Sequence, residues 1–137
     1  AAYHIDSDTG SLCGLLRIAQ AAASTSSSPV YFAVVEAGPE QPMHWCDCSR
    51  KARFPFHGWD LAAASEVWNQ LWCSCPAYIP GSLDKTFAVM QRERWLHFAQ
   101  YGHLAGPGGW PTVGKGSVYA AIRHTGLALK PVPEKRC

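Results

Sequence analysis

The spacing of apolar residues predicts two helices in the first half of the chain. Residues 12–23 have apolar side chains at helical spacing, and Ser11 stands where it can cap that helix. A second helix follows Asp60, which also suits a cap position. Its apolar positions fall at i, i+3, i+7, i+10 and i+11 and are Leu61, Ala64, Trp68, Leu71 and Trp72. Both segments are therefore predicted to be amphipathic helices that bury one face.

A third helix is predicted in the second half of the chain. It begins at Ser82 or Asp84 and continues to about Tyr101, where Gly102 suits the position that follows a helix. The apolar residues expected on its buried side are Phe87, Met90, Trp95 and Phe98.

Two other stretches have the pattern of strands. Residues 30–35 form a continuous apolar run rich in β-branched side chains, which is typical of a buried strand. Residues 117–129 contain two strand-like runs joined at 124–126. These segments can pair in one small antiparallel sheet. We therefore predict a single α+β domain over residues 1–137, with about three helices packed on the sheet and with disulfide stabilisation.

Composition excludes several classes of protein. Hydrophobic residues make up 47% of the 137 residues and charged residues only 16%, which is typical of a globular domain. A net charge of +2 gives no electrostatic reason to expect nucleic acid as a partner. No apolar run approaches the roughly 20 residues of a membrane helix, and the first residues lack the pattern of a signal peptide. We expect a soluble protein without a membrane partner, whose export signal, if any, has been removed or is of another kind.

The cysteines suggest an oxidising destination. Six occur in a short chain, and the unit Trp-Cys-x-Cys occurs twice, at residues 45–48 and 72–75. A C-x-C pair rarely bridges to itself, so the two units would pair with each other and leave Cys13 for Cys137. A zinc site made by the two pairs is the alternative, although structural zinc usually has two to four residues between paired cysteines. We expect a secreted protein, extracellular or delivered to a periplasm, with no metal and no other cofactor.

Cys13 and His124 are the first candidates for catalysis. Cys13 would lie in the first turn of a helix, where the helix dipole favours a thiolate, and His124 lies between two strand-like runs. Papain-like hydrolases need such a pair, because the histidine activates the thiol and later protonates the leaving amine. A disulfide at Cys13 and a hydrogen-bonded structural role for His124 explain the same residues equally well.

A family resemblance extends the hydrolase hypothesis. The string Ala33-Val34-Val35-Glu36-Ala37-Gly38-Pro39, then Pro42-Met43-His44-Trp45-Cys46, then Val67-Trp68-Asn69, resembles the catalytic half of type VI secretion amidase effectors. These are small papain-fold enzymes that cut peptide cross-links in peptidoglycan. The resemblance implies Cys13 as the nucleophile and Cys46 as the third catalytic residue. The family's histidine position is occupied by Tyr31, so His124 or His44 would have to replace it.

A shorter resemblance suggests another enzyme. The run 121–126, followed by a C-terminal cysteine, is similar to the end of fungal guanyl-specific ribonucleases, in which that histidine is the general acid. The resemblance implies His124 in this role. His57, Glu66 and Arg94 occur in an order compatible with the rest of such a site.

The third hypothesis is a non-catalytic effector, toxin or inhibitor that binds a protein or a glycan. The chain has six tryptophans, and Trp45 and Trp110 lie in irregular segments where they could contact a ligand, although packing explains buried tryptophan too. The expected partners are a peptidoglycan peptide or a host or target protein, together with a cognate immunity protein if the chain is a toxin. Our leading prediction is a cysteine-dependent peptidoglycan amidase or endopeptidase, with substrate contacts at Trp45 and Trp110.

Overall fold

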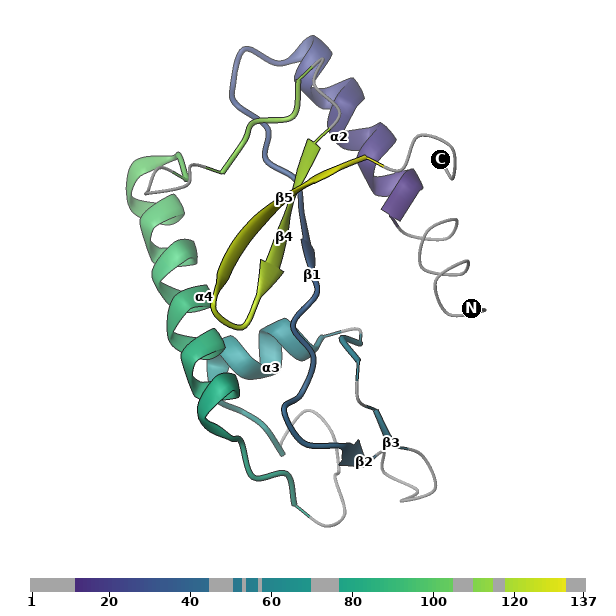
Figure 1. Ribbon diagram of the computed structural model, residues 1–137. Coiled ribbons are helices and arrows are strands. Elements are labelled where there is room, and N and C mark those ends of the chain that lie inside the picture. The colour runs from purple at the N-terminus through teal and green to yellow at the C-terminus, as the bar shows by residue number, and fades with distance from the viewer. Residues whose placement is uncertain are drawn as a thin grey trace. The chain divides into compact units, whose positions relative to one another are not determined.

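The computed structural model describes residues 12–44, 51–52, 54–56, 58–69, 77–104, 110–114 and 118–132. The elements within them are, in chain order, α2 (Cys13–Thr25), β1 (Ala33–Val35), β2 (Met43–His44), β3 (Lys51–Ala52), α3 (Trp59–Ser65), α4 (Ser82–Tyr101), β4 (Val118–Arg123) and β5 (Gly126–Pro131) (Figure 1). The chain divides into two compact units. The described residues up to Val34, with 110–114, 118–121 and 127–132, belong to the first unit, and those in Val35–Leu104 and Ile122–Gly126 belong to the second.

The sheet has the strand order β1-β4-β5 and is mixed. The carbonyl of Phe32 accepts a hydrogen bond from the amide of Ala120, and the carbonyl of Ile122 accepts from the amides of Glu36 and Ala37. Residue numbers rise together across these bonds, so β1 and β4 run parallel. The α+β class is confirmed, but the prediction of an antiparallel sheet is wrong for this pair. A parallel pair needs a long connection, and the described part of the segment between β1 and β4 contains the helices α3 and α4.

Both segments predicted to form strands, 30–35 and 117–129, contain strands in the structure. The run predicted at 30–35 is shorter as a strand, and Tyr31 makes an isolated antiparallel bridge with Thr112. The predicted joint at 124–126 is confirmed as the two-residue turn between β4 and β5, which makes these strands an antiparallel hairpin. A separate two-stranded antiparallel ladder pairs Met43 with Ala52, and both side chains are buried.

The first unit contains α2, which confirms the first predicted helix. The helix begins with Leu12 at its cap position and no side-chain cap, while the predicted cap Ser11 lies outside the described residues. Cys13 and Leu16 are buried, whereas Leu15 and Ile18 are exposed. The apolar residues of this helix therefore do not all face the core.

In the second unit, α3 is shorter than predicted. It follows Gly58, which has a positive φ of 80°, and it ends at Glu66, which has a φ of 56°. A left-handed residue ends the run of helical hydrogen bonds, and the amide of Glu66 bonds to the carbonyl of Ala63 at 3.1 Å. The predicted positions Leu71 and Trp72 lie outside the described residues. The prediction of a helix continuing through Trp68 is wrong, because the chain turns at Glu66.

The predicted bounds of α4 are confirmed, but only part of its predicted buried face is. Gly102 has a φ of 68°, and its amide bonds to the carbonyl of Phe98 at 2.8 Å. Phe87 is fully buried, whereas Trp95 and Phe98 are 40% and 44% exposed, so their predicted burial is wrong. Met90 is half-buried.

Aromatic rings form the core around α3. Trp59 is 1% exposed and packs against Trp68 and Tyr78, with ring centroids 5.5 and 5.9 Å apart. The side-chain amide of Asn69 holds Tyr78 in place, donating to its carbonyl at 3.1 Å and accepting from its amide at 2.6 Å. The turn after α3 is thereby fixed to the segment that precedes α4.

Candidate functional site

Cys13 is disulfide-bonded, and its partner is not among the described residues. Its side chain is buried in the first turn of α2, as the sequence predicts. A sulfur in a disulfide carries no thiolate, so Cys13 cannot attack a substrate in this oxidation state. Two further residues named for the hydrolase site, Trp45 and Cys46, lie outside the described residues.

His124 is held by the backbone in the second unit. Its Nε2 lies 2.7 Å from the carbonyl oxygen of Gly38, and because a carbonyl can only accept, Nε2 carries the hydrogen. Its ring meets the buried Phe87 edge-on, with centroids 6.2 Å apart. His124 thus joins the hairpin turn to the 36–39 segment and to α4, which is the structural role that sequence reasoning left open.

Trp110 and Tyr31 are also engaged within the first unit. Nε1 of Trp110 donates to the carbonyl of Phe32 at 3.4 Å, and its side chain is half-buried. Tyr31 makes the backbone bridge with Thr112 described above. Trp110 therefore packs beside the segment that leads into β1, and this packing explains its position without a ligand.

Of the residues named for a ribonuclease site, Glu66 has a partner within the structure, whereas one nitrogen of Arg94 has none. Glu66 pairs with Arg92, which also donates to the carbonyl of Ala64 at 3.3 Å. Nη1 of Arg94 is buried without a hydrogen-bond partner, and burial lowers the pKa of its guanidinium. His57 lies outside the described residues. The ion pair of Glu66 closes the end of α3 against α4, which is a structural role.

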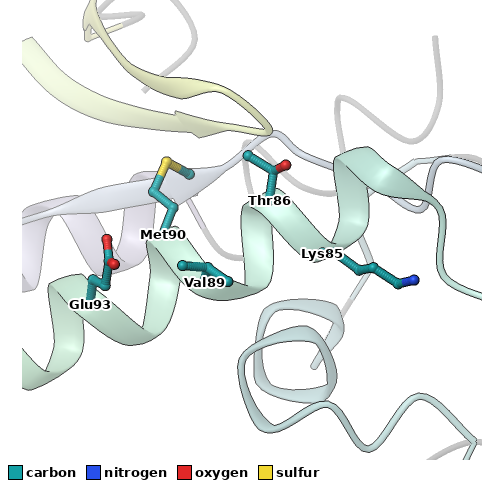
Figure 2. Close-up of a pocket in the computed structure, with 5 residues that line it drawn as sticks. All are labelled: Lys85, Thr86, Val89, Met90 and Glu93. Carbon is teal, nitrogen blue, oxygen red and sulfur yellow. The ribbon is translucent and has the colours of Figure 1, made fainter.

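A groove on α4 is a candidate site that sequence reasoning missed. It has a volume of about 440 Å³ and is lined by five side chains of the helix, Lys85, Thr86, Val89, Met90 and Glu93 (Figure 2). Val89 is 45% exposed. Val89 is thus an exposed apolar side chain on a helix whose opposite face is buried. It is available for contact with a ligand.

Opposite charges stand at the two ends of this groove. Figure 2 shows Lys85 and Glu93 at opposite ends of the row of labelled side chains, with Val89 and Met90 between them. Eight residues of helix separate the two charged positions by about 12 Å. The groove can therefore meet a ligand that has an apolar centre, an acidic group at one end and a basic group at the other.

The sequence contains a signal for this surface. Val89 lies two residues after the buried Phe87 and so falls on the opposite side of the helix. Leu96, seven residues further on, returns to the same side as Val89 and is 69% exposed. Val89 and Leu96 are therefore two exposed apolar residues on the outer face of α4, separate from the core stripe.

No protein-family model, curated protein or solved structure matches this chain. Within the described part of the chain, no three or more His, Cys, Asp and Glu side chains gather in a way that could hold a metal ion. None of the helices described here is long and apolar enough to span a bilayer. The resemblances to amidase effectors and ribonucleases stay predictions.

Proposed function

We propose that this protein is a secreted, disulfide-stabilised binding domain that holds an extended peptide segment of a target protein in the groove on α4. The observation that carries the proposal is the groove itself, with apolar Val89 and Met90 between Lys85 and Glu93. The disulfide at Cys13 supports an oxidising compartment, where such a bond restricts the unfolded chain.

The dimensions of the groove favour a peptide of a particular kind. An extended chain rises about 3.3 Å per residue, so the roughly 12 Å between the two charged positions corresponds to about four residues. An acidic and a basic residue at the ends of such a segment would meet Lys85 and Glu93. One or two apolar residues between them would cover Val89 and Met90, whose burial supplies most of the binding free energy.

A binding role agrees better with the described residues than the hydrolase that the sequence predicts. That enzyme requires a free thiol and an imidazole directed at it. Cys13 is disulfide-bonded, and His124 is bound to a backbone carbonyl and packed on Phe87. The cysteine hydrolase therefore stays a prediction, and it requires a reduced form of the protein.

The proposal is tested with a labelled, end-capped peptide, Glu-Leu-Leu-Lys, by fluorescence anisotropy. We expect Val89→Asp to raise the Kd by about tenfold or more, because a charge replaces an apolar contact worth about 1.4 kcal/mol. Lys85→Glu and Glu93→Lys should each weaken binding, and the effect should shrink at high salt. The matched control is Ile18→Asp, which changes an exposed apolar residue of α2 and should leave the Kd unchanged.

Two results would contradict the proposal. One is the absence of binding at millimolar peptide, and the other is an equal Kd for the wild type and Val89→Asp. Mass spectrometry of the peptide after incubation with reduced protein supplies a separate answer. Cleaved peptide, lost on Cys13→Ala, would restore the cysteine hydrolase as the better account.

A further inference from the structure

Three side chains with rings gather at the C-terminal end of α4. His97 lies one helical turn before Tyr101, and their ring centroids are 4.7 Å apart. His103 follows the helix, and its ring lies 5.3 Å from His97 and 6.0 Å from Tyr101. His103 is exposed and His97 is half-buried, so solvent reaches this cluster, which we call the imidazole cluster.

The backbone explains why the two imidazoles meet. Gly102 has the left-handed conformation that ends many helices, and this reverses the chain so that His103 returns beside the last turn. Nδ1 of His97 lies 3.0 Å from the carbonyl oxygen of His103. Since a carbonyl oxygen can only accept, Nδ1 of His97 donates, and in the neutral ring the lone pair is on Nε2.

We propose that His97 and His103 together bind one divalent transition-metal ion, of the kind represented by Cu²⁺, Ni²⁺ or Zn²⁺. An imidazole whose Nδ1 donates to a backbone carbonyl has its tautomer and orientation fixed in the way that protein metal ligands usually have. Metal–nitrogen bonds of about 2.0–2.1 Å place the centres of two rings on one ion about 5 Å apart. The 5.3 Å between these rings fits that arrangement.

The charges around the imidazole cluster also favour a cation. The C-terminal end of a helix has a partial negative charge, which Lys or Arg commonly offsets, but the last turn of this 20-residue helix contains no basic residue. Glu93 precedes His97 by four positions and so lies on the same side of the helix. Two imidazoles and water ligands would complete a site of modest affinity, and the ring of Tyr101 restricts the rotation of His97.

The test is a titration of the oxidised 137-residue chain with Cu²⁺, followed by electron paramagnetic resonance and calorimetry. We expect one ion per chain and a spectrum with hyperfine structure from two imidazole nitrogens. His97→Ala and His103→Ala should each raise the Kd by about tenfold or more. Ser82→Ala, an exposed polar position at the other end of α4, is the matched control and should bind the ion as the wild type does.

Several results would overturn the proposal. They are the absence of binding at millimolar ion, a signal from a single nitrogen at one equivalent, or unchanged affinity in the double variant His97→Ala/His103→Ala. Unchanged affinity would place the ion on other donors of the chain. Thermal melts of the metal-free variants serve as a folding check, and because both substitutions are near the helix end, we expect melts close to that of the wild type.

Discussion

The two halves of α4 both contain apolar residues on one face but have different surroundings. In the first half, Asp84, Phe87 and Ala88 are fully buried. In the second half, Trp95 and Phe98 continue the same face but are 40% and 44% exposed. The comparison shows that an apolar stripe identifies a surface that can be buried, whereas burial itself depends on which element packs against it.

The difference follows from the elements that meet the helix within the second unit. α3 lies beside the first half of α4, and its last residues bond to Arg92 (Figure 1). The ring of His124 reaches Phe87 from the hairpin turn. Because α3 ends at Ser65, the contacts that bury the first half are not repeated along the second. The exposed second half, with the imidazole cluster at its end, is available for ligands.

The largest effect is expected from a pair of identical substitutions on the two halves. Phe87→Ala should lower the free energy of unfolding by about 3–5 kcal/mol, since it removes a fully buried ring and leaves a cavity. Phe98→Ala should cost about 1 kcal/mol or less, because its ring is already partly in water. Urea denaturation of both variants measures the two values.

Similar costs for the two variants would contradict the comparison, because they would mean that both halves are equally part of the core. If Phe87→Ala does not fold, Phe87→Leu gives a smaller loss of the same origin that can still be compared with Phe98→Leu.

The second effect concerns the polar start of the helix. The buried carboxylate of Asp84 accepts hydrogen bonds from the amides of Glu40 and Gly81, both at 2.9 Å, and from the hydroxyl of Tyr78. Asp84→Ala leaves these donors without an acceptor and should cost about 3–4 kcal/mol of unfolding free energy. Glu93→Ala is the matched control on the exposed side and should change stability by about 0.5 kcal/mol or less.

Equal stability of Asp84→Ala and Glu93→Ala would show that the network does not stabilise the helix start. The variant Asp84→Asn, which keeps a side-chain acceptor, should lie between the wild type and Asp84→Ala in the same denaturation experiment.

The sequence predicted which helices and strands occur better than it predicted the residues at which they begin and end. The bounds of α4 followed from local signals, since Gly102 supplies the positive φ that ends the helix. The end of α3 could not be predicted, because Glu66 is not a residue type that favours a left-handed conformation. The end of α3 also contacts Arg92, which is far away in the sequence and pairs with Glu66 and the carbonyl of Ala64.

The catalytic residues named from the sequence stay predictions, for a physical reason. Cysteines and histidines were selected by their chemistry, but whether a thiol is free or an imidazole is available depends on partners in space. Cys13 has a disulfide partner, and His124 has the carbonyl of Gly38. The side chains of the groove and of the imidazole cluster have no distinctive pattern in the sequence, because each residue is ordinary by itself. Only the helix spacing and the turn at Gly102 bring them together.

The smallest effect, and the one that most directly probes the buried start of α4, is a change in alkaline stability. Burial first, and then the carboxylate of Asp84, raises the pKa of Tyr78. Above the ordinary tyrosine pKa of about 10, the unfolded state releases this proton while the folded state keeps it. Because the unfolded state then binds fewer protons, the free energy of unfolding falls as the pH rises beyond about 10. Below that pH the contribution of Tyr78 to stability is fully present.

Tyr78→Phe should cost about 1 kcal/mol at neutral pH, through the lost hydrogen bond. Its stability should then fall less steeply than that of the wild type, by up to about 1.4 kcal/mol per pH unit, between about pH 10 and 11.5. Thermal or urea unfolding across this range measures the difference, with Tyr101→Phe as the control at an exposed tyrosine in the last turn of α4. If the free energies of unfolding of the wild type and Tyr78→Phe fall equally with pH, the phenol loses its proton at the same pH in the folded and unfolded states. The start of α4 would then be as open to solvent as its end.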